Sequence, residues 1–173
     1  GNISISNSAA DFNAKTSGGN ISLEHIDGKL DVFTSGGNIN ADDIKKGILA
    51  KTSGGNINLS KVLVSTDVST SGGEIELEEI SGSVKASTSG GNIKANIISL
   101  TEILDLRTSG GSIHSAIPSG LGLDLDLSAE NINTPLSNFS GTSKKDRVLG
   151  KMNGGGITVH LQTSGGNISL NYK

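Results

Sequence analysis

The sequence predicts an all-β fold: a single-stranded parallel β-helix (β-solenoid) with 18-residue rungs and two short strands in each rung. Three observations predict it, namely a hexapeptide that recurs at a fixed spacing, apolar residues that alternate within each repeat, and glycine pairs between the alternating segments. Glycine pairs every 18 residues would break any helix of ordinary length. We therefore expect short strands that stack in parallel, and we expect the winding to be right-handed.

The hexapeptide Thr-Ser-Gly-Gly-Asn-Ile sets the length of the repeat. Copies of it begin, each 18 residues after the last, at Thr16, Thr34, Thr52, Thr70 and Thr88, and Glu74 replaces the asparagine in the Thr70 copy. A further copy begins at Thr108, an eroded copy at Leu127 and the last clean copy at Thr163. A two-stranded unit of this size cannot bury its apolar side alone, so equivalent units must stack to form a continuous core.

Period-two alternation places the apolar side chains of each unit on one side. In the second unit the residues that face the core are Ile21, Leu23, Leu30 and Val32. We expect Gly18, Gly19 and Gly28 to form the two turns of this unit, because glycine accepts positive φ angles without a Cβ penalty. Each repeat is therefore predicted to run strand, turn, strand, turn.

The chain is predicted to be one solenoid domain over residues 1–173. Regular rungs are expected over 1–132, where the repeat holds, and closing strands over 157–173, where alternation returns. Residues 133–156 do not follow the repeat. We expect them to form an irregular loop or a cap, since an insert in a solenoid is either a functional loop or a cover for an exposed edge.

Composition excludes several classes of function. The 173 residues carry 14 basic and 17 acidic groups, which argues against a basic surface for nucleic acid or anionic lipid. No apolar run approaches the length of a membrane span. There is no cysteine for a disulfide or thiolate metal site, and the histidines show no metal-ligand spacing. No nucleotide-binding motif or calcium nonapeptide is present, so we predict no cofactor and no metal.

Two columns of polar residues are predicted to be structural. The asparagine after each glycine pair recurs, and stacked rungs would align these side chains into an amide ladder in which each hydrogen-bonds the next. Its members are Asn20, Asn38, Asn56, Asn92 and Asn167. The repeat threonines share the parity of the core residues, so we expect them to close a corner of the core. This column includes Thr34, Thr52 and Thr88.

Carboxylates form the strongest candidate for a functional surface. By repeat position Glu24, Asp42 and Glu78 belong to one outward column, with Glu76 close by. A second outward column is expected to hold Asp31, Asp67, Asp105 and Asp124. Glycoside cleavage would require two carboxyls at a defined separation in a groove, and the sequence shows columns without a groove. We predict no catalytic residues, and we take Glu24, Asp42, Glu76 and Glu78 as the candidate binding residues.

The chain resembles a bacterial family of adhesin domains, a group of uncharacterised exported β-helix domains common in Bacteroidetes. The resemblance rests on the repeated Thr-Ser-Gly-Gly-Asn-Ile and on the closing segment 150–170, Gly-Lys-Met-Asn-Gly-Gly-Gly-Ile-Thr-Val-His-Leu-Gln-Thr-Ser-Gly-Gly-Asn-Ile-Ser-Leu. It covers essentially the whole chain. It implies export through an N-terminal signal that lies outside this sequence, and a place at the cell surface, at the outer membrane or in the periplasm. The family supplies no catalytic residues to transfer.

Together these observations predict a non-enzymatic, exported solenoid that binds a glycan or a surface protein through its flat faces. One alternative is an envelope scaffold that assembles by end-to-end stacking of rungs, as a monomer or weak oligomer in solution. A second alternative is a carbohydrate-active enzyme, because parallel β-helices host such activities, although only analogy between folds supports it.

Overall fold

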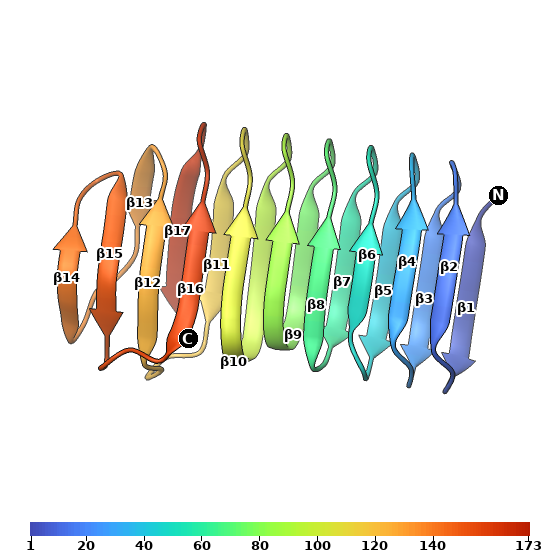
Figure 1. Ribbon diagram of the computed structural model, residues 1–173, viewed down its shortest axis with the longest axis horizontal. Helices are drawn as coiled ribbons and strands as arrows, with labels where there is room; N and C mark the ends of the chain where they lie inside the picture. The colour runs from blue at the N-terminus through green and yellow to red at the C-terminus, as the bar shows by residue number, and fades with distance from the viewer.

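The computed structural model describes residues 1–173 and confirms the predicted β-solenoid: seventeen strands, all hydrogen-bonded into one continuous wound sheet (Figure 1). No helix that could cross a bilayer is present. The strands form two opposed layers, which we call face A and face B, and each regular rung contributes one strand or half-strand to each layer.

Face A contains, in spatial order, β1 (Ile3–Ser8), β3 (Ile21–Ile26), β5 (Ile39–Ile44), β7 (Ile57–Val62), the first halves of β9 (Ile75–Ser87) and β10 (Ile93–Arg107), β11 (Ile113–Ile117), β17 (Asn167–Tyr172) and β13 (Asn131–Asn133). Face B contains β2 (Phe12–Thr16), β4 (Leu30–Thr34), β6 (Ile48–Lys51), β8 (Ser65–Ser69), the second halves of β9 and β10, β16 (Ile157–Gln162), β12 (Leu123–Ser128), β15 (Arg147–Met152) and β14 (Phe139–Ser143).

The core is a single column of aliphatic side chains between the two faces, formed by 37 buried residues. On face A the core positions do not alternate strictly, because Leu23 and Ile26 both point inward although two residues, an even number, lie between them. His25 lies between them with a φ of 53°, in the left-handed region. Asp43 and Lys61 repeat this conformation one and two rungs later. This left-handed residue, which recurs up to Glu79, resets the alternation and explains the odd spacing in these repeats, whereas β10 lacks it and alternates strictly through Ala95 and Ile97.

The repeat glycines serve close packing between rungs, and the expectation that Gly18, Gly19 and Gly28 adopt positive φ is wrong. A Cβ at Gly19 would lie 2.0 Å from the carbonyl oxygen of Gly1 in the neighbouring rung. A Cβ at Gly28 would lie 1.9 Å from the carbonyl oxygen of Ala10. The main chains of adjacent rungs therefore approach so closely at these corners that no side chain fits between them.

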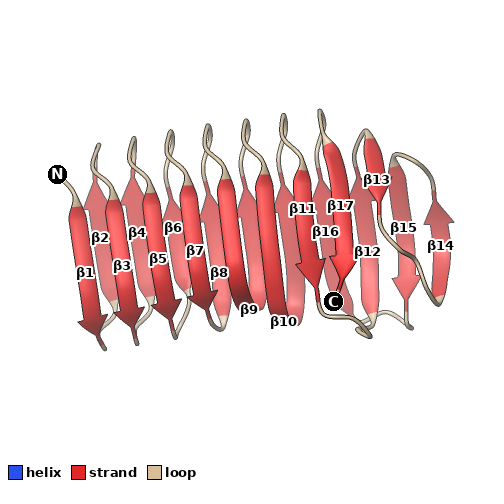
Figure 2. Cartoon of the chain, turned by 180° about the vertical axis from the view of Figure 1, so that it is seen from behind, coloured by secondary structure: helices blue, strands red, loops and turns tan.

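The last repeat of the sequence is inserted between two earlier ones. On face B, β16 pairs with β10 on one side and with β12 on the other, both in parallel (Figure 1). On face A, β17 lies between β11 and β13 in the same way (Figure 2). The C-terminal rung is thus an internal layer of the stack. One predicted column changes as a result: Asp124 pairs in register with Thr158, and it is Asp126 that lies beside His160.

Residues 133–156 contain an antiparallel hairpin at the end of the stack opposite β1. β15 pairs antiparallel with β12 and β14 pairs antiparallel with β15, so the direction of the ladder is reversed there. Val148 and Met152 of β15 are buried, and the half-buried Phe139 of β14 packs against the core. The hairpin therefore covers the outer edge of β12 on face B.

A buried hydroxyl without a partner gives a first prediction on stability. Thr66 occupies a core position, is 2% exposed, and its Oγ1 makes no hydrogen bond. Thr66→Val removes that hydroxyl and keeps the branched shape, so we expect the free energy of unfolding to rise by about 1 kcal/mol. The measurement is the urea midpoint at unchanged m value.

Thr52→Val is the matched control for this prediction, because the Thr52 hydroxyl is buried but donates to the carbonyl of Gly37 at 2.9 Å and accepts from the N–H of Gly55 at 3.3 Å. The control should lower the free energy of unfolding. A loss of stability in both variants would contradict the account of Thr66.

Candidate functional site

The threonine column lies at the corner of the core where each glycine pair turns. The Oγ1 of Thr34 donates to the carbonyl oxygen of Gly19 in the preceding rung at 2.9 Å and accepts from the N–H of Gly37 at 3.3 Å. Thr52 and Thr88 repeat both bonds, and all three side chains are buried. Each hydroxyl thus ties two rungs together and satisfies main-chain groups that water cannot reach.

The asparagine column lies on the exposed side of the same corner and bonds differently from the expected amide ladder. The Oδ1 of Asn20 accepts from the backbone N–H of Asn38, and the Oδ1 of Asn38 accepts from the backbone N–H of Asn56, both at 2.8 Å. The side chains therefore satisfy main-chain donors of the next rung. Direct contact between side chains occurs only where the column is irregular, as at Asn92, whose amide donates to Glu74 at 2.9 Å. The backbone N–H of Asn167 donates to the Oγ of Ser112 at 3.1 Å, and its Oδ1 accepts from the Nδ2 of Asn131 at 2.9 Å, so the expected amide-to-amide bond forms at this rung.

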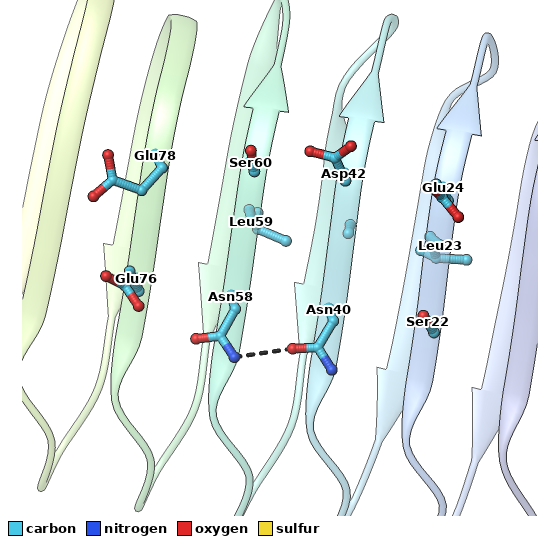
Figure 3. Close-up of a pocket in the computed structure, with 11 residues that line it drawn as sticks. Ser22, Leu23, Glu24, Asn40, Asp42, Asn58, Leu59, Ser60, Glu76 and Glu78 are labelled. Atoms are coloured by element: carbon cyan, nitrogen blue, oxygen red, sulfur yellow. Dashed lines mark hydrogen bonds between the residues drawn. The ribbon is translucent and has the colours of Figure 1, made fainter.

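The candidate binding residues lie together in a shallow depression of about 370 Å³ on face A (Figure 3). We call this depression the trough. Register places its outward side chains in two parallel columns across β3, β5, β7 and β9. One column consists of Glu24, Asp42, Ser60 and Glu78, and the other consists of Ser22, Asn40, Asn58 and Glu76. The structure thus brings Glu24, Asp42, Glu76 and Glu78 to one surface.

The trough is hollow because short side chains interrupt its columns. Ser60 stands where the neighbouring rungs carry Asp42 and Glu78, and Ser22 begins the second column. Between them, the Nδ2 of Asn58 donates to the Oδ1 of Asn40 at 2.9 Å, which leaves the remaining donors and acceptors of both amides directed at solvent. Sequence reasoning missed these two amides, although their 18-residue spacing was available as a signal.

Ion pairs concentrate at one end of the trough. The Nζ of Lys94 lies 2.7 Å from Glu76 and 3.1 Å from Glu78, and the Nδ2 of Asn96 donates to Glu78 at 2.9 Å. The hydrogen bond from Asn96, together with Lys94, lowers the pKa of Glu78 despite slight burial, while Glu76 and Glu78 raise the pKa of Lys94. Glu78 is therefore held as a carboxylate at neutral pH.

At the other end of the trough the carboxylates have longer contacts with cationic side chains. Asp42 has Lys61 at 3.9 Å and Glu24 has the His25 ring at 3.5 Å, and both acidic side chains remain accessible. The Nδ1 of His25 lies closer to Asp43, at 3.0 Å, on the rim outside the trough. An incoming cation or hydroxyl group would therefore meet the free oxygens of Glu24 and Asp42 first.

A second charged cluster lies on face B where the C-terminal rung is inserted. His160 of β16 lies between Asp105 of β10 and Asp126 of β12, with its Nδ1 3.0 Å from Asp105. Arg107 donates to both oxygens of Asp105 at 2.7 and 2.8 Å, and Arg147 of β15 lies 2.9 Å from Asp126. These contacts link the inserted strand and the terminal hairpin to the regular rungs.

Asp105 is expected to make stability depend on pH. Partial burial favours its protonated form, but the bonds from Arg107 and His160 outweigh burial and lower the pKa of Asp105 below its usual 3.8. A lowered pKa contributes stability above the unfolded-state value, and this stability is lost as pH falls through the folded-state value. Asp105→Asn should therefore cost about 1–2 kcal/mol at pH 7, and this difference should shrink below about pH 4.

The measurement is urea unfolding of wild type and Asp105→Asn between pH 7 and pH 2.5. Asp31→Asn, which removes an exposed carboxylate of the same face, is the matched control and should change stability by less than about 0.5 kcal/mol. A difference between wild type and Asp105→Asn that stays constant across the whole range would contradict the role given to the carboxylate charge.

The titratable side chains form no metal-binding group anywhere in the structure. Nowhere in residues 1–173 do three or more histidine, aspartate or glutamate side chains converge in an arrangement that could hold an ion. His25, His114 and His160 lie on separate strands. What the trough can offer chemically is therefore a surface of fixed negative charges and amide groups at regular intervals.

Comparison with known proteins assigns the fold a family. No curated protein matches this chain, and no solved structure matches it. The family model described as Toastrack DUF4097 matches residues 1–171, which is nearly the whole chain. Its match agrees with the stacked parallel rungs described above. The chain therefore belongs to the Toastrack DUF4097 family.

Proposed function

We propose that this domain is a non-enzymatic binding module that holds an extended polar partner, a glycan or a segment of a surface protein, in the trough on face A. The observation that carries the proposal is the convergence of Glu24, Asp42, Glu76 and Glu78 on one hollow of about 370 Å³. The module is an adhesin of an exported protein and works at the cell surface or in the periplasm. This location rests on the resemblance in the repeat and in the closing segment 150–170.

Regular spacing supports an extended partner. Adjacent rungs repeat at about 4.8 Å, so the trough presents carboxylates and amides at fixed intervals along one line. Glu24 and Asp42 accept hydrogen bonds from hydroxyls or pair with cationic side chains, while Asn40 and Asn58 both donate and accept. A partner chain that runs along the solenoid axis meets a polar side chain of each column at every rung, and these repeated contacts compensate for a shallow surface.

The state of the carboxylates supports binding over catalysis. An acid–base pair for glycoside cleavage needs one carboxyl whose pKa is raised so that it can donate a proton. Glu78 has the opposite shift, because Asn96 and Lys94 stabilise its charged form. Glu76 is tied to the same lysine at 2.7 Å. Glu78 is therefore not prepared for the role of general acid.

A binding screen of the folded protein against immobilised glycans and matrix proteins tests the proposal. We expect saturable binding that is lost after heat unfolding and weakened at least about tenfold by Glu76→Lys combined with Glu78→Lys. Glu79→Lys with Glu130→Lys is the matched control, because it makes the same charge change outside the trough. Lysine already occupies the equivalent of Glu79 at Lys61, with nearly the same φ.

Two outcomes would overturn the proposal. One is a folded protein that binds nothing on the panel. The other is binding that both double variants weaken equally, which would show a response to net charge and no contribution from the trough.

A second candidate, an envelope scaffold, is favoured by the difference between the two ends of the stack. β1 pairs with β3 alone on face A, and Ile3 and Ile5 are only partly buried whereas their equivalents Ile21 and Leu23 are covered. At the opposite end the β14–β15 hairpin covers the outer edge of face B. Stacking would therefore use the β1–β2 rung and stop at a pair of molecules. A mass that stays at 17.5 kDa over a wide concentration range would contradict this role.

A further inference from the structure

One outward column of face B carries no acidic residue along its whole length. Register aligns it across β2, β4, β6, β8, β9, β10, β16, β12 and β15. Its members, in spatial order, are Lys15, Phe33, Lys51, Ser69, Ser87, Arg107, Gln162, Ser128 and Arg147. Four outward carboxylates of face B, Asp31, Asp67, Asp105 and Asp126, lie in the neighbouring column, and Asp124 lies one column further, so the first column differs sharply in charge from the others.

Phe33 gives this column an apolar platform between two cations. Phe33 is 37% exposed, and the Nζ of Lys15 lies 5.3 Å from its ring centre. Lys51 stands on the opposite side of Phe33, one rung further along. The three side chains occupy consecutive rungs at about 4.8 Å intervals, so an ammonium, a ring and an ammonium follow one another along a straight line.

These two lysines differ from the lysines of face A. Lys61 and Lys94 of face A lie against carboxylates of the trough. Lys15 and Lys51 are exposed and have no carboxylate partner. The nearest acidic groups of face B, Asp31 and Asp67, flank Leu49 in the neighbouring column. The charges of Lys15 and Lys51 are therefore available to a partner.

We propose that Lys15, Phe33 and Lys51 form a second binding site, for a linear acidic glycan. A pyranose ring packs its C–H face on Phe33, and the acidic groups of the flanking sugars pair with Lys15 and Lys51. The spacing between adjacent rungs, about 4.8 Å, is close to the length of one sugar unit, so successive sugars meet successive rungs. Because the column itself holds no acidic residue, such a chain can continue over Ser69 and Ser87. This site is separate from the trough and does not depend on the function proposed for it.

Titration with a defined oligogalacturonate, followed by calorimetry at low salt, tests the site. We expect saturable binding that weakens as salt is raised, since the ion pairs are exposed. Phe33→Ala and Lys51→Gln should each weaken binding about tenfold, whereas Phe33→Tyr should retain it. Lys61→Gln on face A is the matched control and should have no effect. A sulfated oligosaccharide of equal length shows whether carboxylates are required or any acidic sugar suffices.

The neutral oligosaccharide of the same length should bind at least about tenfold more weakly than the oligogalacturonate. Three results would overturn the proposal: no binding by the folded wild type, unchanged affinity in Phe33→Ala, or equal loss in Lys61→Gln and Lys51→Gln. Glu76→Lys with Glu78→Lys should leave oligogalacturonate binding intact. This result would show that the site on face B and the trough bind independently.

Discussion

Gly55→Ala is expected to lower the free energy of unfolding by about 3 kcal/mol or more, while Gly54→Ala should change it by less than about 0.5 kcal/mol. A Cβ at Gly55 would lie 1.9 Å from the carbonyl oxygen of Gly37 in the adjacent rung, so the two main chains would have to separate. At Gly54 the nearest atom, the carbonyl oxygen of Ser35, is 3.9 Å away. The two variants add the same methyl group at neighbouring positions and differ only in the space available.

Urea unfolding monitored by circular dichroism measures both free energies, and the wild-type spectrum is the control for an unchanged fold. Equal stability of the two variants would show that adjacent rungs lie further apart than the 1.9 Å between a Cβ at Gly55 and the carbonyl oxygen of Gly37 implies. A loss confined to Gly54→Ala would contradict the assignment of the second glycine to the contact between rungs.

Leu161→Ala is expected to cost about 3 kcal/mol, although the residue lies in the last repeat of the sequence. Leu161 is fully buried in β16, which is paired in parallel with β10 and β12. If repeats stacked in sequence order, this strand would lie at an end of the solenoid and would fray. Its internal position instead makes it part of the cooperative core.

Leu149→Ala is the matched control, because Leu149 is 50% exposed on the hairpin strand β15 and should lose less than about 0.5 kcal/mol. Amide hydrogen exchange adds a second measurement. The N–H groups of β16 should exchange only through global unfolding, more slowly than those of β14 at the edge. Fast exchange across 157–162 would contradict the inserted position.

The repeat determines most of the fold because each of its signals has one physical meaning. The spacing of 18 residues fixes the rung, alternation fixes the core side, and equal spacing aligns Glu24 with Asp42 and Ser60 with Glu78. Parallel in-register stacking makes repeat position equivalent to spatial column wherever rungs follow one another. The column that holds the candidate binding residues could therefore be predicted without a structure.

Spatial order could not be predicted where rungs leave the sequence order. The copies at Leu127 and Thr163 both present an alternating strand, and either can pair with β10. Periodicity predicts which side chains face the core, but it does not predict which strands are neighbours. For this reason the prediction that Asp124 lies in the column of Asp105 was wrong. For the same reason the sequence did not predict the contact between His160 and Asp105, which are 55 residues apart.

The trough itself also lay beyond the sequence. Its depth depends on how side-chain length varies along a column, and on the amide bond from Asn58 to Asn40 at 2.9 Å. The bond from Asn96 that lowers the pKa of Glu78 joins residues 18 apart, so the repeat aligns them, but repeat position alone does not predict the pKa.

Nuclear magnetic resonance of the 17.5 kDa domain with the partner found in the screen tests the central claim most directly. The side-chain amide signals of Asn40 and Asn58 report from the trough, and the side-chain amide of the exposed Asn13 reports from face B. On titration, the signals of Asn40 and Asn58 should shift and saturate together while Asn13 stays unmoved. Binding at saturation that leaves Asn40 and Asn58 unshifted would contradict the assignment of the trough as the binding surface.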